Sequence, residues 1–335
     1  MSATALSDAP LLAHVVRSGV VESVHHGLLI ALDADGAATR QCGDVHAPIL
    51  PRSALKPAQA LACLRAGADL TGEHLALACA SHSGEDTHLA GVRAMLEQAD
   101  LGVDQLDNTP DYPLGEQARL AWIAAGRGKE SLAQNCSGKH AAMLTACRAA
   151  GWDTATYREV GHPLQVLVEE TLADLAGEPV ARRTVDGCGA PALGISLMGL
   201  ARMFAALASA RSGTRRAAVA DAMRRHPQAV GGTGRVVTDL MRAIPGLIAK
   251  DGAEGVIAAA LPDGRAFAVK IADGNARAAG VSLLAALESD GVLELPGVDA
   301  SAARTAVRSE ILGHGRPVGQ VRAVDNSTYG SGLRE

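Results

Sequence analysis

The chain has 335 residues, of which 48% are hydrophobic and only 2% aromatic, so we expect a large core of Ala, Leu and Val. Its formal net charge of −5 argues against the basic surface of a nucleic-acid-binding protein. The apolar runs are too short to span a membrane, and residues 1–25 lack the pattern of a signal peptide. We therefore expect a cytoplasmic protein whose six cysteines are reduced.

The predicted elements are strands at both ends of the chain and helices in the middle. Residues 12–44 contain short Val and Leu runs with a hairpin turn at Asp35-Gly36. From residue 53 to about 245, apolar residues recur at helical spacing, and one such segment is 191–210. After residue 250, "GVIAAALPDGRAFAVKIADG" predicts a hairpin, residues 275–290 a helix, and "GQVRAVD" a last strand.

This order predicts one α/β domain over residues 1–335. Residues 1–52 and 246–335 would form an antiparallel sheet flanked by helices. Residues 53–245 would form an inserted, mainly helical part, with a cleft where the two parts meet.

Lysine is rare: only five of the 31 basic residues are lysine. Because a guanidinium group does not lose its proton in a protein, the retained lysines are enriched for roles that need a neutral amine. In "PRSALKPAQ", Ser53 and Lys56 stand three residues apart where a helix begins, on one face. A desolvated lysine can act there as the base toward the serine hydroxyl. The alternative is a helix cap beside a solvated lysine.

Two further segments could complete such a site. Lys250 stands beside a strand and close to Gly252, as the lysine of a K-T-G element does in acyl-serine enzymes. "CASHSGE" supplies Ser83, for which the alternative is a capping box with Asp86. "GGTGR" at 231–235 lacks the Lys-Ser/Thr of a phosphate loop, which argues against nucleotide binding.

Cysteines in glycine-containing turns are candidates for a metal site. Cys136 and Lys139 lie in "NCSGKH", and Cys188 lies in "DGCGAP". The chain has no C-x-x-C pair of the zinc type, so convergence of these side chains depends on the fold. The alternative is that these cysteines are small buried hydrophobic residues.

In chain order, "PRSALKPAQ", "CASHSGE", "NCSGKHAAML", "DGCGAP" and "AKDGAEGV" closely resemble the asparaginase II family of the inducible Rhizobium etli type. The resemblance covers nearly the whole chain. It implies a fold similar to that of serine β-lactamases, penicillin-binding proteins and serine-dependent glutaminases. It also implies an amidohydrolase, a homodimer, that hydrolyses L-asparagine to L-aspartate and ammonia through a serine–lysine acyl-enzyme mechanism.

The resemblance also implies roles for individual residues. Ser53 and Lys56 match the first serine–lysine tandem, and Ser83 and Lys250 match the second, with Lys270 as the rival of Lys250. Which of Ser53 and Ser83 forms the acyl-enzyme stays open. The implied metal is a structural or modulatory Zn²⁺, and its ligands would be Cys136, Lys139, Cys188 and a water. The residues implied around the substrate are Arg52, Gly84, Glu85, His140 and Asp186, of which His140 and Asp186 would also support the metal.

Several alternatives remain at this stage. The chain could be a glutaminase, because glutamine differs from asparagine by one methylene group, which changes the binding free energy by only about 1–3 kcal/mol. It could also be a β-lactamase-like serine acylase. It could also be a non-catalytic zinc-binding or amino-acid-binding protein. Release of ammonia from L-asparagine by the purified protein would separate the catalytic from the non-catalytic alternatives.

Overall fold

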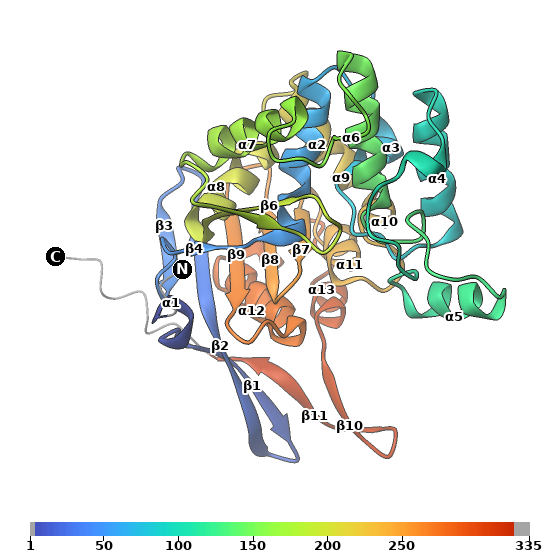
Figure 1. Ribbon diagram of the computed structural model, residues 1–335. Helices are drawn as coiled ribbons and strands as arrows, with labels where there is room; N and C mark the ends of the chain where they lie inside the picture. Colours follow the sequence, from blue (N-terminus) through green and yellow to red (C-terminus); the bar gives the residue numbers. More distant parts are fainter. Residues whose placement is uncertain (1–3, 325–335) are drawn as a thin grey trace. The chain divides into compact units, whose positions relative to one another are not determined.

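The computed structural model describes residues 4–324 (Figure 1). Its contacts divide the chain into two compact units. The sheet unit consists of Met1–Ala54, Gly194–Ser209 and Asp239–Glu335, and the helical unit consists of Leu55–Leu193 and Ala210–Thr238. The prediction of a single domain stays a prediction.

The strands of the sheet unit come from both ends of the chain. They are β1 Leu11–Arg17, β2 Val20–Leu32, β3 Ala38–Cys42, β4 Pro48–Ile49, β7 Ile248–Gly252, β8 Val256–Ala260, β9 Ala266–Ile271, β10 Glu310–Gly313 and β11 Arg316–Ala323.

All but β4 form one antiparallel sheet. Its strand order is β10-β11-β1-β2-β9-β8-β7, and β3 also pairs with β2. N-terminal strands pair with C-terminal strands at two places in this sheet: β1 pairs with β11, and β2 pairs with β9. This arrangement confirms the predicted fold class, in which both chain ends build one sheet.

Helices α8 (Leu197–Ala208) and α12 (Ala276–Ser289) pack on β8 and β9. Every residue of these two strands is buried, so both of their faces are covered. The chain's two phenylalanines, Phe204 on α8 and Phe267 on β9, are fully buried. The remaining helices of this unit are α1 Thr4–Ser7, the 3₁₀ helix η3 Val292–Glu294 and α13 Ala300–Ala306.

The helical unit is built around α6 (Ser137–Ala150), whose residues 137–147 are all buried. A helix that is buried on every side is central to its unit, and α6 packs against α2, α3, α4 and α7. The elements around it are α2 Lys56–Arg65, α3 Gly72–Ala78, α4 Asp86–Gln98, η2 Val103–Gln105, α5 Glu116–Ala124, α7 Pro163–Ala176, β5 Arg182–Val185, α9 Arg215–Arg225 and α10 Pro227–Val230. The elements that cross from one unit to the other are η1 Arg52–Leu55, β6 Pro191–Ser196 and α11 Val236–Ala243.

The structure differs from the sequence prediction at segment 191–210. This segment begins with strand β6, and the helix α8 starts only after Ser196. The Ser196 hydroxyl accepts a hydrogen bond from the Gly199 N–H at 2.8 Å, which is the signature of a helix N-cap. The prediction of one helix was wrong here because a short apolar run that is buried on all sides has no period that separates strand from helix.

Other predicted elements are present. The hairpin after residue 250 is β8–β9, and the helix at 275–290 is α12. The predicted last strand, residues 319–325, corresponds to β11, and Asp325 lies outside the described residues. β7 was not predicted, and it places Lys250 inside a strand.

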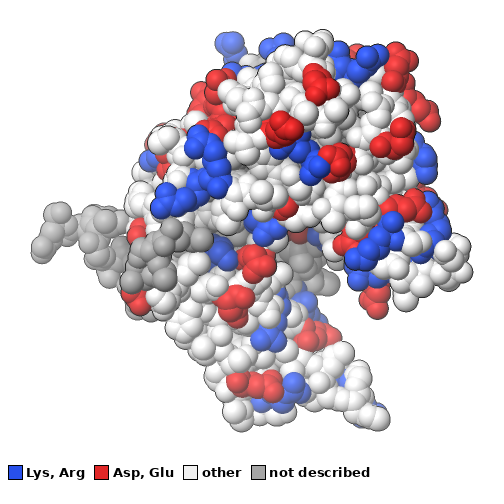
Figure 2. Space-filling view, viewed as in Figure 1, with Lys and Arg blue, Asp and Glu red and all other residues white. Residues whose placement is uncertain are grey.

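Helix length and surface charge are properties that differ between classes of protein. Between residues 4 and 324, the helices are all too short or too polar to traverse a lipid bilayer. On the face shown in Figure 2, Lys and Arg side chains lie interspersed with Asp and Glu.

Candidate active site

The amine of Lys56 lies in the interior of the helical unit, where α2 begins. The side chain is 1% exposed. Its Nζ donates hydrogen bonds to Ala80 O at 2.5 Å, to Ser81 Oγ at 3.0 Å and to Cys136 Sγ at 3.1 Å. Three acceptors around one buried amine hold it in a single position. The alternative of a solvated lysine is therefore excluded for Lys56.

The two serines of "CASHSGE" have different surroundings. Ser81 Oγ is the hydroxyl that Lys56 contacts, whereas Ser83 Oγ donates to Gly231 O at 3.1 Å. The catalytic role predicted from the sequence for Ser83 stays a prediction, and the contact between Ser81 and Lys56 was not predicted. Since both serines stand in the same short segment, only the backbone path shows which one turns toward Lys56.

Ser53 lies in the 3₁₀ helix η1 (Arg52–Leu55), which leads directly into α2. Arg52 has a φ of 54°, in the left-handed region that non-glycine residues seldom adopt. Strained backbone of this kind costs of order 1–3 kcal/mol and is concentrated at functional sites. The outlier directly precedes Ser53 in the chain.

Lys250 belongs to the sheet unit, and its side chain on β7 is fully buried. Its Nζ donates to Asp251 O at 2.7 Å and pairs with the Asp251 carboxylate. A Cβ on Gly252 would overlap the carbonyl oxygen of Pro51, so β7 runs against the turn that leads to Ser53. The glycine permits this close backbone approach.

The rival lysine, Lys270, has a different environment on β9. Its Nζ donates to Glu254 O at 2.5 Å and to Ile271 O at 2.8 Å. Burial lowers the pKa of Lys270. Its amine closes the turn that precedes β8, a role that needs no catalysis.

The three residues predicted to bind zinc converge in the helical unit. Cys136 precedes α6, Lys139 lies in its first turn, and Cys188 lies in the loop between β5 and β6. Lys139 Nζ donates to Cys188 Sγ at 3.1 Å, and the two thiols share a hydrogen bond. All three side chains are buried.

The charges in this cluster favour a thiolate at Cys136. The hydrogen bond from Cys188, reinforced by the Lys56 and Lys139 amines, holds the pKa of Cys136 well below its ordinary value. The same hydrogen bond, together with burial, raises the pKa of Cys188. Burial by itself lowers the pKa of Lys139, but the nearby Cys188 and Cys136 outweigh it and raise that pKa.

This donor set fits Zn²⁺, which prefers sulfur and nitrogen ligands. A thiolate is the form of cysteine that binds metal, and an amine must release its proton to do so. Within residues 4–324, no three side chains of the His, Cys, Asp and Glu types gather as a metal site. Beside the two thiols, the Lys139 amine is the third donor group of this cluster.

The family model for L-asparaginase II matches residues 13–323. The chain belongs to the L-asparaginase II family. This membership confirms the resemblance drawn from the motifs and supports an amidohydrolase-type role for the protein.

Two solved structures illustrate what else the chain is similar to. A crystal structure of Mglu has 15% sequence identity and a TM-score of 0.45, over 79% of this chain and 67% of that one. A beta-lactamase from Mycobacterium bovis has 14% identity and a TM-score of 0.41, over 88% of this chain and 98% of that one. The chain thus spans about two thirds of the Mglu chain. A search of the curated proteins found no match, and the family assignment rests on the family model.

Two other residues implied by the family resemblance lie close in the chain to Lys139 and Cys188. His140, next to Lys139, is fully buried, and its Nδ1 is 2.7 Å from the Tyr157 hydroxyl oxygen. Burial lowers the pKa of His140 well below its ordinary value, so the ring is neutral. The Asp186 carboxylate accepts the N–H of the next residue and shapes the turn that carries Cys188.

Gly84 and Glu85 follow Ser83 at the start of α4. Gly84 has a φ of 78°, and a Cβ there would lie 2.8 Å from Pro113 Cβ. Both oxygens of the Glu85 carboxylate have partners in the protein: Thr233 N–H at 2.7 Å and Gln228 Nε2 at 2.8 Å. The structure thus shows Glu85 engaged by a loop of the protein, and its predicted substrate contact stays a prediction.

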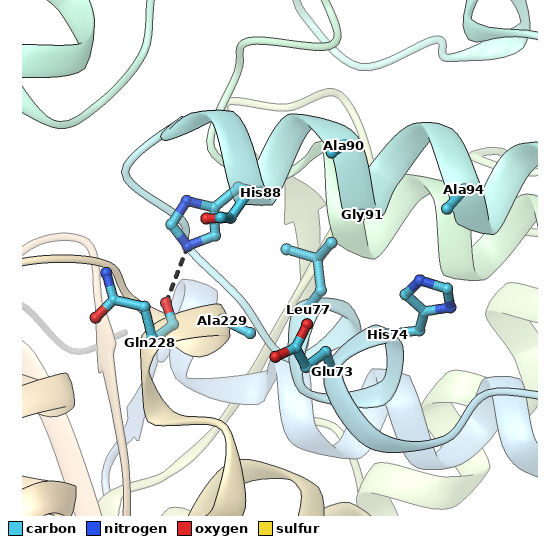
Figure 3. A pocket seen from close by; sticks show the side chains of 10 residues that line it. Glu73, His74, Leu77, His88, Ala90, Gly91, Ala94, Gln228 and Ala229 are labelled. Carbon is cyan, nitrogen blue, oxygen red and sulfur yellow. Dashed lines mark hydrogen bonds between the residues drawn. The ribbon is translucent and has the colours of Figure 1, made fainter.

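A pocket of about 460 Å³ opens between α3, α4 and α10 (Figure 3). Its lining, as far as the described residues show, contains none of the predicted site residues. His88, at one end of this pocket, accepts the Glu85 N–H at 3.1 Å and completes a capping box with Glu85. This box stands in place of the Ser83–Asp86 box considered from the sequence.

Proposed function

We propose that this protein is an L-asparaginase that hydrolyses L-asparagine to L-aspartate and ammonia. The observation that carries the proposal is the Lys56 amine, which is buried and 3.0 Å from the hydroxyl oxygen of Ser81. A desolvated lysine can act as the base toward a serine hydroxyl, and the candidates here are Ser53, three residues before Lys56 in the chain, and Ser81, which contacts the amine. Membership of the L-asparaginase II family supports asparagine as the substrate.

In the proposed reaction, Ser53 Oγ bonds to the side-chain amide carbon of asparagine, and the hydroxyl proton passes to the Lys56 amine. The C–N bond then breaks, and the leaving nitrogen takes the proton back from Lys56 and departs as ammonia. Water hydrolyses the resulting β-aspartyl ester, which frees Ser53 and releases L-aspartate. A well-placed general base of this kind contributes about 10²–10⁴-fold to the rate.

The choice of nucleophile follows from sequence and local backbone. Ser53 stands three residues before Lys56, and the left-handed Arg52 precedes it. Ser81 is the second candidate, because its hydroxyl already contacts the base. In the proposed assignment Ser81 holds the Lys56 amine, Arg52 binds the substrate carboxylate, and Lys250 supplies a second cation from β7.

We further propose that Cys136, Lys139 and Cys188 hold a Zn²⁺ ion. Once bound, the ion supplies a fixed positive charge and ties the three side chains together. Its role is structural or modulatory, because a serine nucleophile and an amine base already account for the chemistry. Cys136 Sγ belongs to this set and also contacts Lys56 Nζ, so it links the two groups.

The proposal also includes a homodimer in the cytoplasm. The homodimer follows from the resemblance to the family. The cytoplasm is supported by the six cysteines, which are all buried and free of disulfides. Light scattering of the purified protein tests the dimer.

The substrate is tested by measuring ammonia release from L-asparagine and from L-glutamine. We expect a much higher kcat/KM for L-asparagine. Equal or higher kcat/KM for L-glutamine would make the protein a glutaminase, and no release from either would remove the hydrolase proposal.

A further inference from the structure

The glycine loop, defined as residues 231–235, lies along the serine segment, defined as residues 79–85. Ser81 N–H donates to Val230 O at 3.1 Å, and Ser83 N–H donates to Gly231 O at 2.8 Å. Arg235 Nη1 in turn donates to Ser81 O at 3.1 Å. The glycine loop and the residue before it therefore engage both backbone groups of Ser81, whose hydroxyl contacts the Lys56 amine.

The fit between the two segments is close enough to require glycine. Gly232 has a φ of 117°, which side chains rarely allow. A Cβ at this position would lie 2.5 Å from Ser83 Oγ and 2.9 Å from Glu85 Oε1. The "GGTGR" motif, which does not match a phosphate loop, thus has a structural purpose: it brings the loop backbone against the serine segment.

The carboxylate of Glu85 fastens this loop. Its Oε1 accepts the Thr233 N–H at 2.7 Å, and its Oε2 accepts from Gln228 Nε2 at 2.8 Å. Gln228 Nε2 also donates to Thr233 Oγ1 at 2.9 Å, which closes a ring of three residues that includes the Thr233 backbone. His88 Nε2 lies 2.9 Å from Gln228 O, as the dashed line in Figure 3 shows, and holds the backbone on which the ring depends.

The charge state of Glu85 agrees with this role. Although burial by itself raises the pKa of Glu85, the hydrogen bonds from Thr233 and Gln228 outweigh it and leave that pKa below its ordinary value. The carboxylate form is thus the one that accepts both hydrogen bonds.

We propose that Glu85 is a positioning residue for the hydrolysis: its carboxylate fastens the glycine loop, and the fastened loop keeps Ser81 against Lys56. The effect on turnover rests on the proposed function, whereas the fastening of the loop is independent of it. A displacement of about 1 Å at a reacting centre can cost about 10²-fold in rate. In this proposal Glu85 acts on turnover through the loop that it fastens.

The test exchanges the two partners. Glu85→Gln turns one acceptor into an amide that faces the Gln228 amide, donor against donor. Gln228→Glu places two carboxylates together. The double variant E85Q/Q228E restores one donor and one acceptor to the pair and keeps an oxygen for the Thr233 N–H. Glu97→Gln makes the same chemical change at an exposed position of α4 and is the matched control.

Each single variant should lower kcat about tenfold or more while KM changes by less than about threefold. The double variant should recover most of the lost kcat, because the coupling between the two positions is restored. Hydrogen–deuterium exchange of the peptide that contains residues 231–235 should speed up in each single variant and return toward wild type in the double. Glu97→Gln should behave as wild type in both measurements.

The outcomes separate the possible explanations. A single-variant loss that the double variant does not recover would overturn the proposal, because it would show that the Glu85 carboxylate itself is required by the substrate. Unchanged exchange in both single variants would also overturn it. If Glu85→Gln does not fold, Gln228→Glu and the double variant still make the comparison. If the wild type releases no ammonia from L-asparagine, the proposed function fails, and the exchange measurement alone decides whether Glu85 fastens the loop.

Discussion

Lys56 Nζ lies 3.1 Å from Cys136 Sγ, so the candidate base and a candidate zinc ligand are in direct contact. The same amine also contacts Ser81 Oγ at 3.0 Å. The candidate zinc set therefore adjoins the serine–lysine pair through one shared thiol. Changes at Cys136 should accordingly affect turnover as well as metal content.

The two serines of the serine segment should differ in their effect on catalysis. Ser81→Ala removes the hydroxyl that holds Lys56, and we expect kcat to fall about 10²-fold or more. Ser83→Ala removes a hydroxyl whose hydrogen bond goes to Gly231 O and not to Lys56, so we expect less than a tenfold loss of kcat. Steady-state kinetics on L-asparagine checks both. A larger loss for Ser83→Ala would return the second catalytic serine to the residue first assigned from the sequence.

This difference illustrates what the sequence could and could not predict. The strand pattern at both chain ends was sufficient to predict the antiparallel sheet, because hairpin turns and alternating apolar residues are local signals. The order of the motifs along the chain was sufficient to predict the family. The choice between Ser81 and Ser83 depends on hydrogen bonds to Val230 and Gly231, about 150 residues away in the chain, and no local pattern reports such a contact.

The same limit applies to Glu85. The family resemblance implied a place near the substrate for Glu85, which stays a prediction, but it did not indicate that the carboxylate accepts hydrogen bonds from Thr233 and Gln228. The "GGTGR" motif was the available signal, because a run of glycines indicates a place where backbone must approach closely. What it approaches could be learned only from the fold.

Protein purified without added metal should contain about one Zn²⁺ per chain, because two thiols and an amine form a buried donor set. Cys136→Ala and Cys188→Ala should each lose most of it, whereas Cys42→Ala, at a buried cysteine of the sheet unit, should keep it. Metal analysis by mass spectrometry checks this. A zinc-free wild type, or an unchanged content in Cys136→Ala, would remove the zinc site from the account.

The protein should lose stability as the pH falls below about 6.5, the ordinary pKa of histidine. The rings of His82 and His88 are stacked 5.2 Å apart, and burial lowers the pKa of both. The unfolded chain therefore binds protons that the folded chain does not. The contribution of these two histidines to the free energy of unfolding is fully present above that pH and declines below it. Each ring contributes at most about 1.4 kcal/mol per pH unit.

Thermal unfolding between pH 7.5 and pH 5 checks this slope. His88→Gln should make the decline of Tm shallower, while His314→Gln, at an exposed position, is the control. A Tm that stays constant or rises on acidification would show that these two rings are not held neutral by the fold.

The central claim is that the buried Lys56 amine is the base in the hydrolysis of L-asparagine. Lys56→Met is the most direct test, because methionine keeps the length of the stem and removes the amine, whereas arginine would overpack a site that is 1% exposed. The measurement is ammonia release from L-asparagine by wild type and variant, with Tm recorded for both. We predict clear release by the wild type and a kcat lower by about 10²–10⁴-fold in a folded variant. A folded Lys56→Met that retains kcat within about tenfold of wild type would contradict the account, because it would place the base elsewhere.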